Sequence, residues 1–272
     1  KMWSYQGIAH GCSSLMYFRY RGATKGAEQY CYGIIDQDNV KRRKFYEVQS
    51  FFKEMKDNEA LTQSEVKSDV AVVYDYESMA SFRIQRQSFL MDYKQEVYRL
   101  YRPFYKKNIN MDVIPSDSDF DKYKVLLLPV MIVHKKEVQD KVRKFVSGGG
   151  TVVFTYRTAV KDYYNNLTLG QFNPTYYTDL VGGYVEEVES FQDDQVALLI
   201  GNEEFEGING TATVFRDMLK TTTAKTLFKY EDEFFEDLAA VTLNEYEGGK
   251  VYYIGSGADN TIMDAITNKI IN

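Results

Sequence analysis

The chain has 272 residues and a formal net charge of −6, with 44 % apolar residues, 26 % charged residues and 23 tyrosines. No apolar run approaches the roughly 18 residues of a membrane-spanning helix, and no basic stretch offsets the negative charge, so neither a membrane nor a nucleic acid is expected as a partner. The two cysteines, Cys12 and Cys31, are too few for a disulfide framework or a zinc site, so we expect them to be reduced and half-buried, with no metal and no cofactor. The chain opens without a signal-peptide layout, which indicates a cytoplasmic protein. It also opens inside a predicted helix, which indicates a fragment of a larger protein.

The first 57 residues have the pattern of a helix, a strand, a loop and a second helix. We predict these elements over residues 2–10, 15–20, 21–33 and 41–56. The first helix should turn Trp3, Gly7, Ile8 and His10 inward, and the second should turn inward Phe45, Val48, Phe51, Phe52 and Met55. This order fits the last segment of a (β/α) barrel, because a single strand in about 57 residues cannot close a core of its own.

Residues 58–69 are polar and predict a linker, after which a second domain begins. VAVVYD, from Val70, predicts a buried strand, and residues 85–107 predict a helix with one apolar face. Pro103 lies inside that helical pattern, so we expect a kink or an early end there. Residues 111–114 predict the second strand of this domain.

The stretch from Val125 to Thr155 decides the fold class. VLLLPV at 125–130 is apolar without alternation, which is typical of a strand covered on both faces. A helix follows, with an inward face of Val138, Val142, Phe145 and Val146. Three glycines at 148–150 predict a left-handed turn at the helix end, and Val152–Phe154 begins another strand. Strand, helix and strand in this order predict a βαβ unit in a parallel sheet.

Beyond residue 156 the pattern loosens into short strands and a closing helix. The strands are predicted at 196–200, 226–230, 239–243 and 251–254, and the helix at 262–271. The last two strands are joined by a turn at 247–249. Residues 70–272 therefore predict an α/β domain with an open, doubly wound, mostly parallel sheet, of the flavodoxin-like or class I glutamine amidotransferase-like type.

Motifs for chemistry are missing from this second domain. Its first strand ends in Asp75-Tyr76-Glu77, two carboxylates that would repel a phosphate, and no glycine-rich phosphate loop follows. An amidotransferase-like hydrolase would need a cysteine nucleophile after a central strand, and both cysteines lie outside the domain. His134, its only histidine, is expected at a loop or helix start. The domain is predicted to have no catalysis of its own, which leaves a free-standing ligand-binding module as the alternative reading.

Several motifs resemble one enzyme family. WSYQGIAHG at 3–11, LMYFRYRGATKGAEQYCYGIIDQDN at 15–39 and KFYEV at 44–48 resemble the end of the catalytic barrel of glycoside hydrolase family 42, the β-galactosidases. The second domain resembles the trimerisation domain of that family, in the segments VAVVYDYES, QSFLMDYKQEVYRLYRPF, LLLPVMIV, SGGGTVVFTYRTAVKDYYN and GKVYYIG. The resemblance covers essentially the whole chain, with the motifs in the family's order.

The resemblance implies a retaining enzyme that acts on terminal β-galactosides and assembles as a homotrimer. Its two catalytic glutamates precede the WSYQ helix in the family, so this chain holds no catalytic residue and is expected to be inactive alone. Glu28 matches the family glutamate that hydrogen-bonds galactose hydroxyls. Cys31 stands where the family commonly has a sugar-contacting histidine, so sugar specificity is expected to differ. Tyr20 replaces a family tryptophan, and His10 is expected to pack inside. For the trimer interface we predict the loops 76–86 and 156–177.

Overall fold

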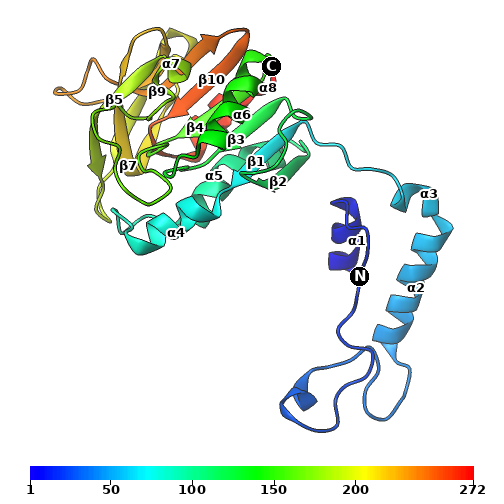
Figure 1. Cartoon of the computed structure of the whole chain (residues 1–272). Coiled ribbons are helices and arrows are strands. Elements are labelled where there is room, and N and C mark those ends of the chain that lie inside the picture. Colours follow the sequence, from blue (N-terminus) through cyan, green and yellow to red (C-terminus); the bar gives the residue numbers. More distant parts are fainter. The chain divides into compact units, whose positions relative to one another are not determined.

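The computed structural model describes residues 1–272, apart from the side chain of Leu61, and divides into two compact units (Figure 1). The first unit is Lys1–Lys67 and the second is Ser68–Asn272. Each unit has its own packing and is described by itself.

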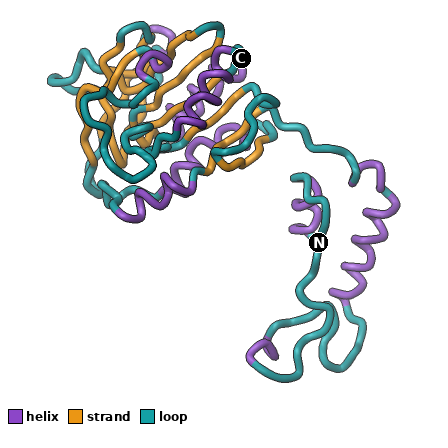
Figure 2. Tube along the Cα trace, viewed as in Figure 1, coloured by secondary structure: helices purple, strands orange, loops and turns teal.

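The first unit is built from two helices, two short turns of helix and a long irregular segment. Its elements are α1 (Met2–Ala9), the 3-10 helix η1 (Ala27–Tyr30), α2 (Arg43–Asp57) and α3 (Glu59–Thr62). Figure 2 shows the segment between α1 and α2 mostly as loop. The strand predicted over 15–20 is therefore wrong. Backbone groups of a strand need a neighbouring strand, and here the pairing is confined to an isolated bridge between Arg21 and Ile35 and to a few backbone hydrogen bonds from residues 34 and 35 to Arg19 and Tyr20. Helix α3 occupies part of the predicted linker.

Helices α1 and α2 pack through fewer side chains than their sequences predict. The Tyr5 ring meets the Phe51 ring edge-on at 5.0 Å, and Phe51 is buried. Phe52, predicted to face inward, is 47 % exposed, because successive helix positions are about 100° apart and only one of the two rings can face α1. Trp3 is 81 % exposed and His10 is exposed as well, so the predicted inward face of α1 is wrong for these two residues, while Gly7 and Ile8 are half-buried.

The second unit is an α/β domain around one sheet of eleven strands. The strands are β1 (Val70–Tyr74), β2 (Met111–Pro115), β3 (Val125–Leu128), β4 (Thr151–Thr155), β5 (Gly183–Ser190), β6 (Ala197–Gly201), β7 (Asn209–Thr221), β8 (Lys225–Tyr230), β9 (Ala239–Tyr246), β10 (Gly249–Ile254) and β11 (Ser256–Ala258). The helices are α4 (Tyr76–Ile84), α5 (Tyr93–Lys106), α6 (Lys136–Ser147), α7 (Thr178–Val181), α8 (Asn260–Ile271) and the short 3-10 helix η2 (Glu203–Phe205).

The sheet is mixed rather than mostly parallel. Strands β2, β1, β3, β4 and β10 lie side by side in that order, and all four of their pairings are parallel. From β10 onward every pairing is antiparallel, through β9, β8, β6, β7 and β11, with β5 on β7. Short connections impose this, because a turn such as Glu247–Gly248 can join only antiparallel neighbours. The sequence pattern missed β5, β7 and β11.

The predicted βαβ unit is confirmed. Strands β3 and β4 are parallel, with Val125 opposite Thr151, and α6 connects them. Gly149 has φ +92°, the left-handed conformation that the three glycines predict at the helix end. Alternate strand residues enter two separate cores: Leu126 and Leu128 pack with the apolar face of α6, while Leu127 packs in the core that α5 and α8 share. Helices on both faces explain why this strand shows no alternation.

The helices after β1 differ from their predicted bounds. Residues 76–84, predicted as an interface loop, form α4, because the Asp75 carboxylate accepts from Ser78 N at 2.9 Å and caps the helix. Helix α5 begins at Tyr93 rather than at residue 85. The side chain of Asp92 caps this start. It continues three residues beyond Pro103, which is buried inside the helix, so the predicted early end is wrong.

Candidate functional site

The first candidate site is a loop of the first unit that is closed at its base by backbone hydrogen bonds. Ile34 N donates to Arg19 O at 2.8 Å, and Ile35 N donates to Tyr20 O at 2.9 Å. Gly22 N returns a bond to Ile35 O at 3.3 Å. These bonds hold residues 19–22 beside residues 33–35, so residues 23–32 project as a closed loop.

Glycine is required at the base of this loop. A Cβ added to Gly33 would lie 2.6 Å from Gly22 N and 2.7 Å from the Arg21 carbonyl carbon, closer than real Cβ atoms approach. Gly26, with φ +80°, begins the single turn η1 at the tip. Gly33 therefore allows the two chain segments to approach closely at the base of the loop, and Gly26 allows the sharp turn at its tip.

Glu28 and Cys31, the two predicted substrate-binding residues, lie on that turn. Cys31 N donates to Glu28 O at 2.9 Å, and both side chains are exposed, so Cys31 is not half-buried as predicted. Arg19 Nη1 lies 2.9 Å from Glu28 Oε2, with the glutamate side chain 63 % exposed and the arginine side chain 30 % exposed. The turn therefore presents a carboxylate and a thiol outward, with the carboxylate held on one side by a cation. A carboxylate oxygen can accept hydrogen bonds from sugar hydroxyls, and a thiol is a weak partner for them.

The second candidate site lies in the second unit at the carboxyl ends of the parallel strands, the usual place for ligands in open α/β sheets. Asp75 follows β1 and its side chain is fully buried. Ser116 Oγ donates to Asp75 Oδ1 at 2.7 Å, and Lys135 Nζ lies 3.4 Å from the same oxygen and 2.7 Å from Glu77 Oε2. The lysine comes from the residue just before α6, so protein groups from three connections meet at this edge.

The Asp75 carboxyl is stabilised in its charged form. Burial acts to raise its pKa, but hydrogen bonds from Ser78 and Ser116 and the positive charge of Lys135 outweigh burial, so the pKa of Asp75 lies below its ordinary value. The same side chain caps α4, and Asp75 N donates to Tyr93 OH at 2.8 Å. The two carboxylates that the sequence predicted to repel phosphate are thus engaged with a lysine.

His134 lies two residues before α6 begins, which agrees with its predicted place at a helix start. Its Nε2 lies 3.1 Å from Thr168 Oγ1, and its ring meets Tyr176 edge-on at 5.2 Å. Burial lowers the pKa of His134, and the nearby charge of Asp162 opposes that shift only in part. The imidazole contacts a hydroxyl and a phenol ring, an arrangement that supports packing of the 161–177 loop.

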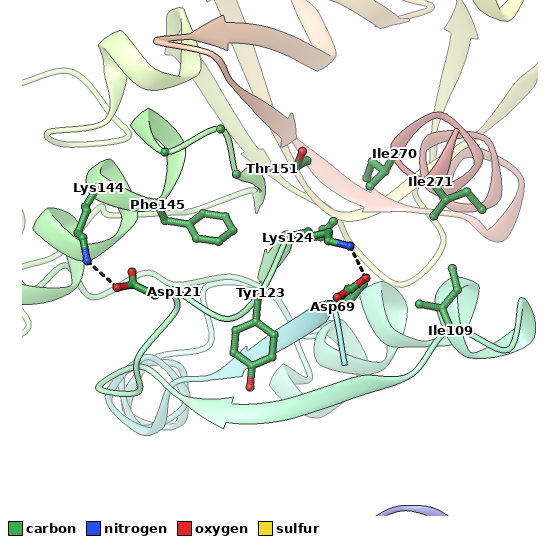
Figure 3. Close-up of a pocket in the computed structure, with 15 residues that line it drawn as sticks. Asp69, Ile109, Asp121, Tyr123, Lys124, Lys144, Phe145, Thr151, Ile270 and Ile271 are labelled. Carbon is green, nitrogen blue, oxygen red and sulfur yellow. Dashed lines mark hydrogen bonds and ion pairs between the residues drawn. The ribbon is translucent and has the colours of Figure 1, made fainter. Parts of the chain in front are cut away.

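At the other ends of the same strands lies a pocket of about 640 Å³ that the sequence did not predict (Figure 3). It lies at the amino ends of β1, β3 and β4, and Phe145 and Ile270 contribute to its apolar wall. Two ion pairs border it: Lys124 Nζ lies 2.8 Å from Asp69 Oδ2, and Lys144 Nζ lies 2.6 Å from Asp121 Oδ2. Each cation in this pocket already has a carboxylate partner, which leaves no free charge there for a ligand.

The described residues hold neither a cluster suited to a metal ion nor a helix suited to a membrane. Leaving aside the side chain of Leu61, no three or more histidine, cysteine, aspartate or glutamate side chains are grouped so that they could hold a metal ion. Within the same described part of the chain, no helix has the length and apolar character needed to span a membrane.

Comparison with protein families matches both units. Residues 1–58 match the family model described as β-galactosidase, and residues 68–272 match the one described as β-galactosidase trimerisation domain. The chain belongs to the family 42 β-galactosidases. This membership confirms the resemblance that the sequence motifs carried.

Relatives in this β-galactosidase family match along nearly the whole chain. The β-galactosidase BgaA of Clostridium cellulovorans is 31 % identical over 100 % of this chain and 41 % of its own length, and GalA of Bacillus licheniformis is 32 % identical over 93 % and 37 %. The crystal structure of the β-galactosidase from Bacillus circulans sp. alkalophilus gives a TM-score of 0.91 at 26 % identity, over 98 % of this chain and 40 % of that one. The chain thus spans about two fifths of the length of the relatives it matches.

Proposed function

We propose that this chain is part of a retaining β-galactosidase that hydrolyses terminal β-galactosides. The carrying observation is the order of the two family matches in one chain, β-galactosidase over 1–58 and trimerisation domain over 68–272. In this proposal residues 1–57 form the last segment of the catalytic barrel, residues 58–69 form a linker and residues 70–272 form the assembly domain. The catalytic glutamates then lie in a part of the enzyme outside these residues.

The assembly domain is proposed to be of the flavodoxin-like type. The parallel part of its sheet has the order β2-β1-β3-β4-β10, which matches the 2-1-3-4-5 order of that fold class. The ligand crevice of such sheets lies at the carboxyl ends of the first and third strands, where Asp75 and Lys135 pair here. This pairing favours an assembly role over a ligand-binding module.

Glu28 and Cys31 are proposed to contribute one edge of the galactose site. The exposed carboxylate of Glu28 can accept two hydroxyl hydrogens at once, which suits neighbouring hydroxyls of a pyranose. Cys31, three residues on, offers only a weak hydrogen bond, so this edge of the site should discriminate less between sugars.

The 272-residue chain alone should not hydrolyse β-galactosides. Cleavage of a glycosidic bond needs a proton donor and a nucleophile facing one another across the sugar, and in the first unit Asp36, Asp38 and Glu47 are instead paired with nearby cations. The measurement is hydrolysis of a nitrophenyl β-galactoside by monodisperse protein purified from a host without its own β-galactosidase. Activity that rises in proportion to the concentration of this protein would contradict the prediction.

Self-association is proposed to produce a homotrimer through two different surfaces of the assembly domain. A three-fold ring joins unlike patches, and stable interfaces are anchored by exposed aromatic and arginine side chains. One candidate patch is the loop 161–177, where Leu169 is 98 % exposed and Tyr164 and Phe172 are also exposed. The other is the end of α4 with the connection to α5, where Ile84 and Phe89 are exposed beside Arg86.

A shortened protein that begins at Ser68 should remain a trimer. The second unit holds both apolar cores of the sheet, so removal of residues 1–67 should not unfold it. Light scattering across micromolar concentrations should report three times the protomer mass. The matched variant Leu169→Asp should lower that mass, whereas Ile200→Asp, on an exposed strand face outside both patches, should not. A monomer from the unmodified shortened protein would argue against assembly by this domain.

A further inference from the structure

We propose that Arg19 is a positioning residue that fixes the carboxylate of Glu28 in the substrate site, a proposal that rests on the β-galactosidase function proposed above. Arg19 Nη1 lies 2.9 Å from Glu28 Oε2. Within the described residues, no other side chain pairs with this carboxylate, and Oε1 has no protein partner. One oxygen is thus held by the guanidinium while both lone pairs of the other stay free for neighbouring sugar hydroxyls.

Arg19 is suited to this task because its backbone lies at the base of the loop and its side chain contacts the tip. Its carbonyl accepts from Ile34 N at 2.8 Å and so closes the loop base, while its side chain extends to the tip nine residues further along the chain. The guanidinium carbon also lies 5.3 Å from the centre of the Phe18 ring, a contact that restricts the arginine rotamer. Backbone and side chain together define where the Glu28 carboxylate can be.

The pair is too exposed for its main effect to be on folding. Surface ion pairs of this kind contribute little to stability, since water screens them and ordering two long side chains costs entropy. A glutamate with three free torsions would have to be ordered when substrate binds, and that ordering weakens binding. Removing the guanidinium should therefore weaken substrate recognition far more than it weakens the fold.

The test compares variants of the full-length enzyme that contains this segment. Arg19→Gln should lower kcat/KM for a nitrophenyl β-galactoside about tenfold, mainly through a higher KM, while Tm stays unchanged. Arg19→Lys, which keeps the charge, should recover part of that loss. The double variant Arg19→Gln/Glu28→Gln should lose no more than Glu28→Gln alone, because both changes remove one shared interaction. Arg43→Gln is the control, since it breaks another solvent-exposed arginine–glutamate pair of the same unit, with Glu47 on α2.

Four results would overturn the proposal, and they distinguish its three possible failures. If the wild-type enzyme does not hydrolyse β-galactosides, the proposed function fails and the role of Arg19 fails with it. If Glu28→Gln is impaired while Arg19→Gln matches the wild type, or if the two losses multiply in the double variant, only the positioning role fails. If Arg19→Gln lowers Tm in proportion to its lost activity, the arginine acts on folding rather than on the carboxylate.

Discussion

Glu28→Ala in the full-length enzyme should lower kcat/KM for β-galactosides by about 30- to 900-fold. That range corresponds to about 2–4 kcal/mol of lost transition-state stabilisation, as expected if two hydroxyl contacts strengthen as the sugar distorts. The turn that carries Glu28 is fixed by Gly26 at its start and by Arg19 at its side, so the loss should come from the missing carboxylate. Steady-state kinetics with a nitrophenyl β-galactoside measures it.

The control for this prediction is Glu47→Ala, which removes another exposed carboxylate of the same unit. Glu47 pairs with Arg43 on the surface of α2, so its loss should leave kcat/KM within twofold of the wild type. Deoxygalactosides extend the test: an analogue that lacks a contacted hydroxyl should be hydrolysed almost equally by wild type and Glu28→Ala. Unchanged kinetics for Glu28→Ala would reassign Glu28 to a loop ion pair with Arg19.

The sheet around β3 and β4 could be predicted because its signals are local. An unbroken apolar run, a helix-spaced face and three glycines follow one another within 31 residues, and each has one common structural meaning. Residues 15–20 are also mostly apolar and aromatic but do not form a strand, since a strand depends on pairing with a neighbouring strand, which this local pattern cannot supply. A capping carboxylate such as Asp75 is short-range information, yet the apolar pattern of α4 is weak, and so that helix was missed.

In the candidate sites, too, the residues with local sequence signals could be predicted and the contacts that depend on the fold could not. Glu28 could be named as a candidate because the residues around it resemble a family motif, whereas its contact with Arg19 depends on how the loop closes. The pairing of Asp75 with Lys135 joins residues 60 positions apart, and it exists only because β1 and β3 are neighbours in the sheet. Sequence alone could therefore indicate that this edge is unsuited to phosphate, but could not show which cation occupies it.

Asp75→Ala should destabilise the second unit by about 3–4 kcal/mol at neutral pH. The substitution removes the cap of α4, leaves the buried Ser116 Oγ without its acceptor and takes from the half-buried ammonium of Lys135 one of its two carboxylate partners, the other being Glu77. Asp75→Asn keeps a capping oxygen but no charge, so its loss should be intermediate. Urea unfolding of the 272-residue protein measures both. Asp112→Ala is the matched control, because that carboxylate likewise accepts from a side-chain hydroxyl, here that of Tyr123, and from a lysine but is one-third exposed, and it should cost about 1 kcal/mol or less.

The pH dependence separates the charge of Asp75 from the packing of its side chain. Because the folded-state pKa lies below the ordinary value of 3.8, the stability due to the charge is fully present above that value and is lost as pH falls through the folded-state pKa. The difference in unfolding free energy between wild type and Asp75→Ala should therefore be largest near pH 7 and should shrink toward pH 3. Asp75→Asn, which has no carboxyl to protonate, should keep a nearly constant difference from Asp75→Ala across that range. A gap between wild type and Asp75→Ala that stays constant down to pH 3 would mean that packing and capping by the Asp75 side chain, rather than its pair with Lys135, account for the stability that this residue contributes.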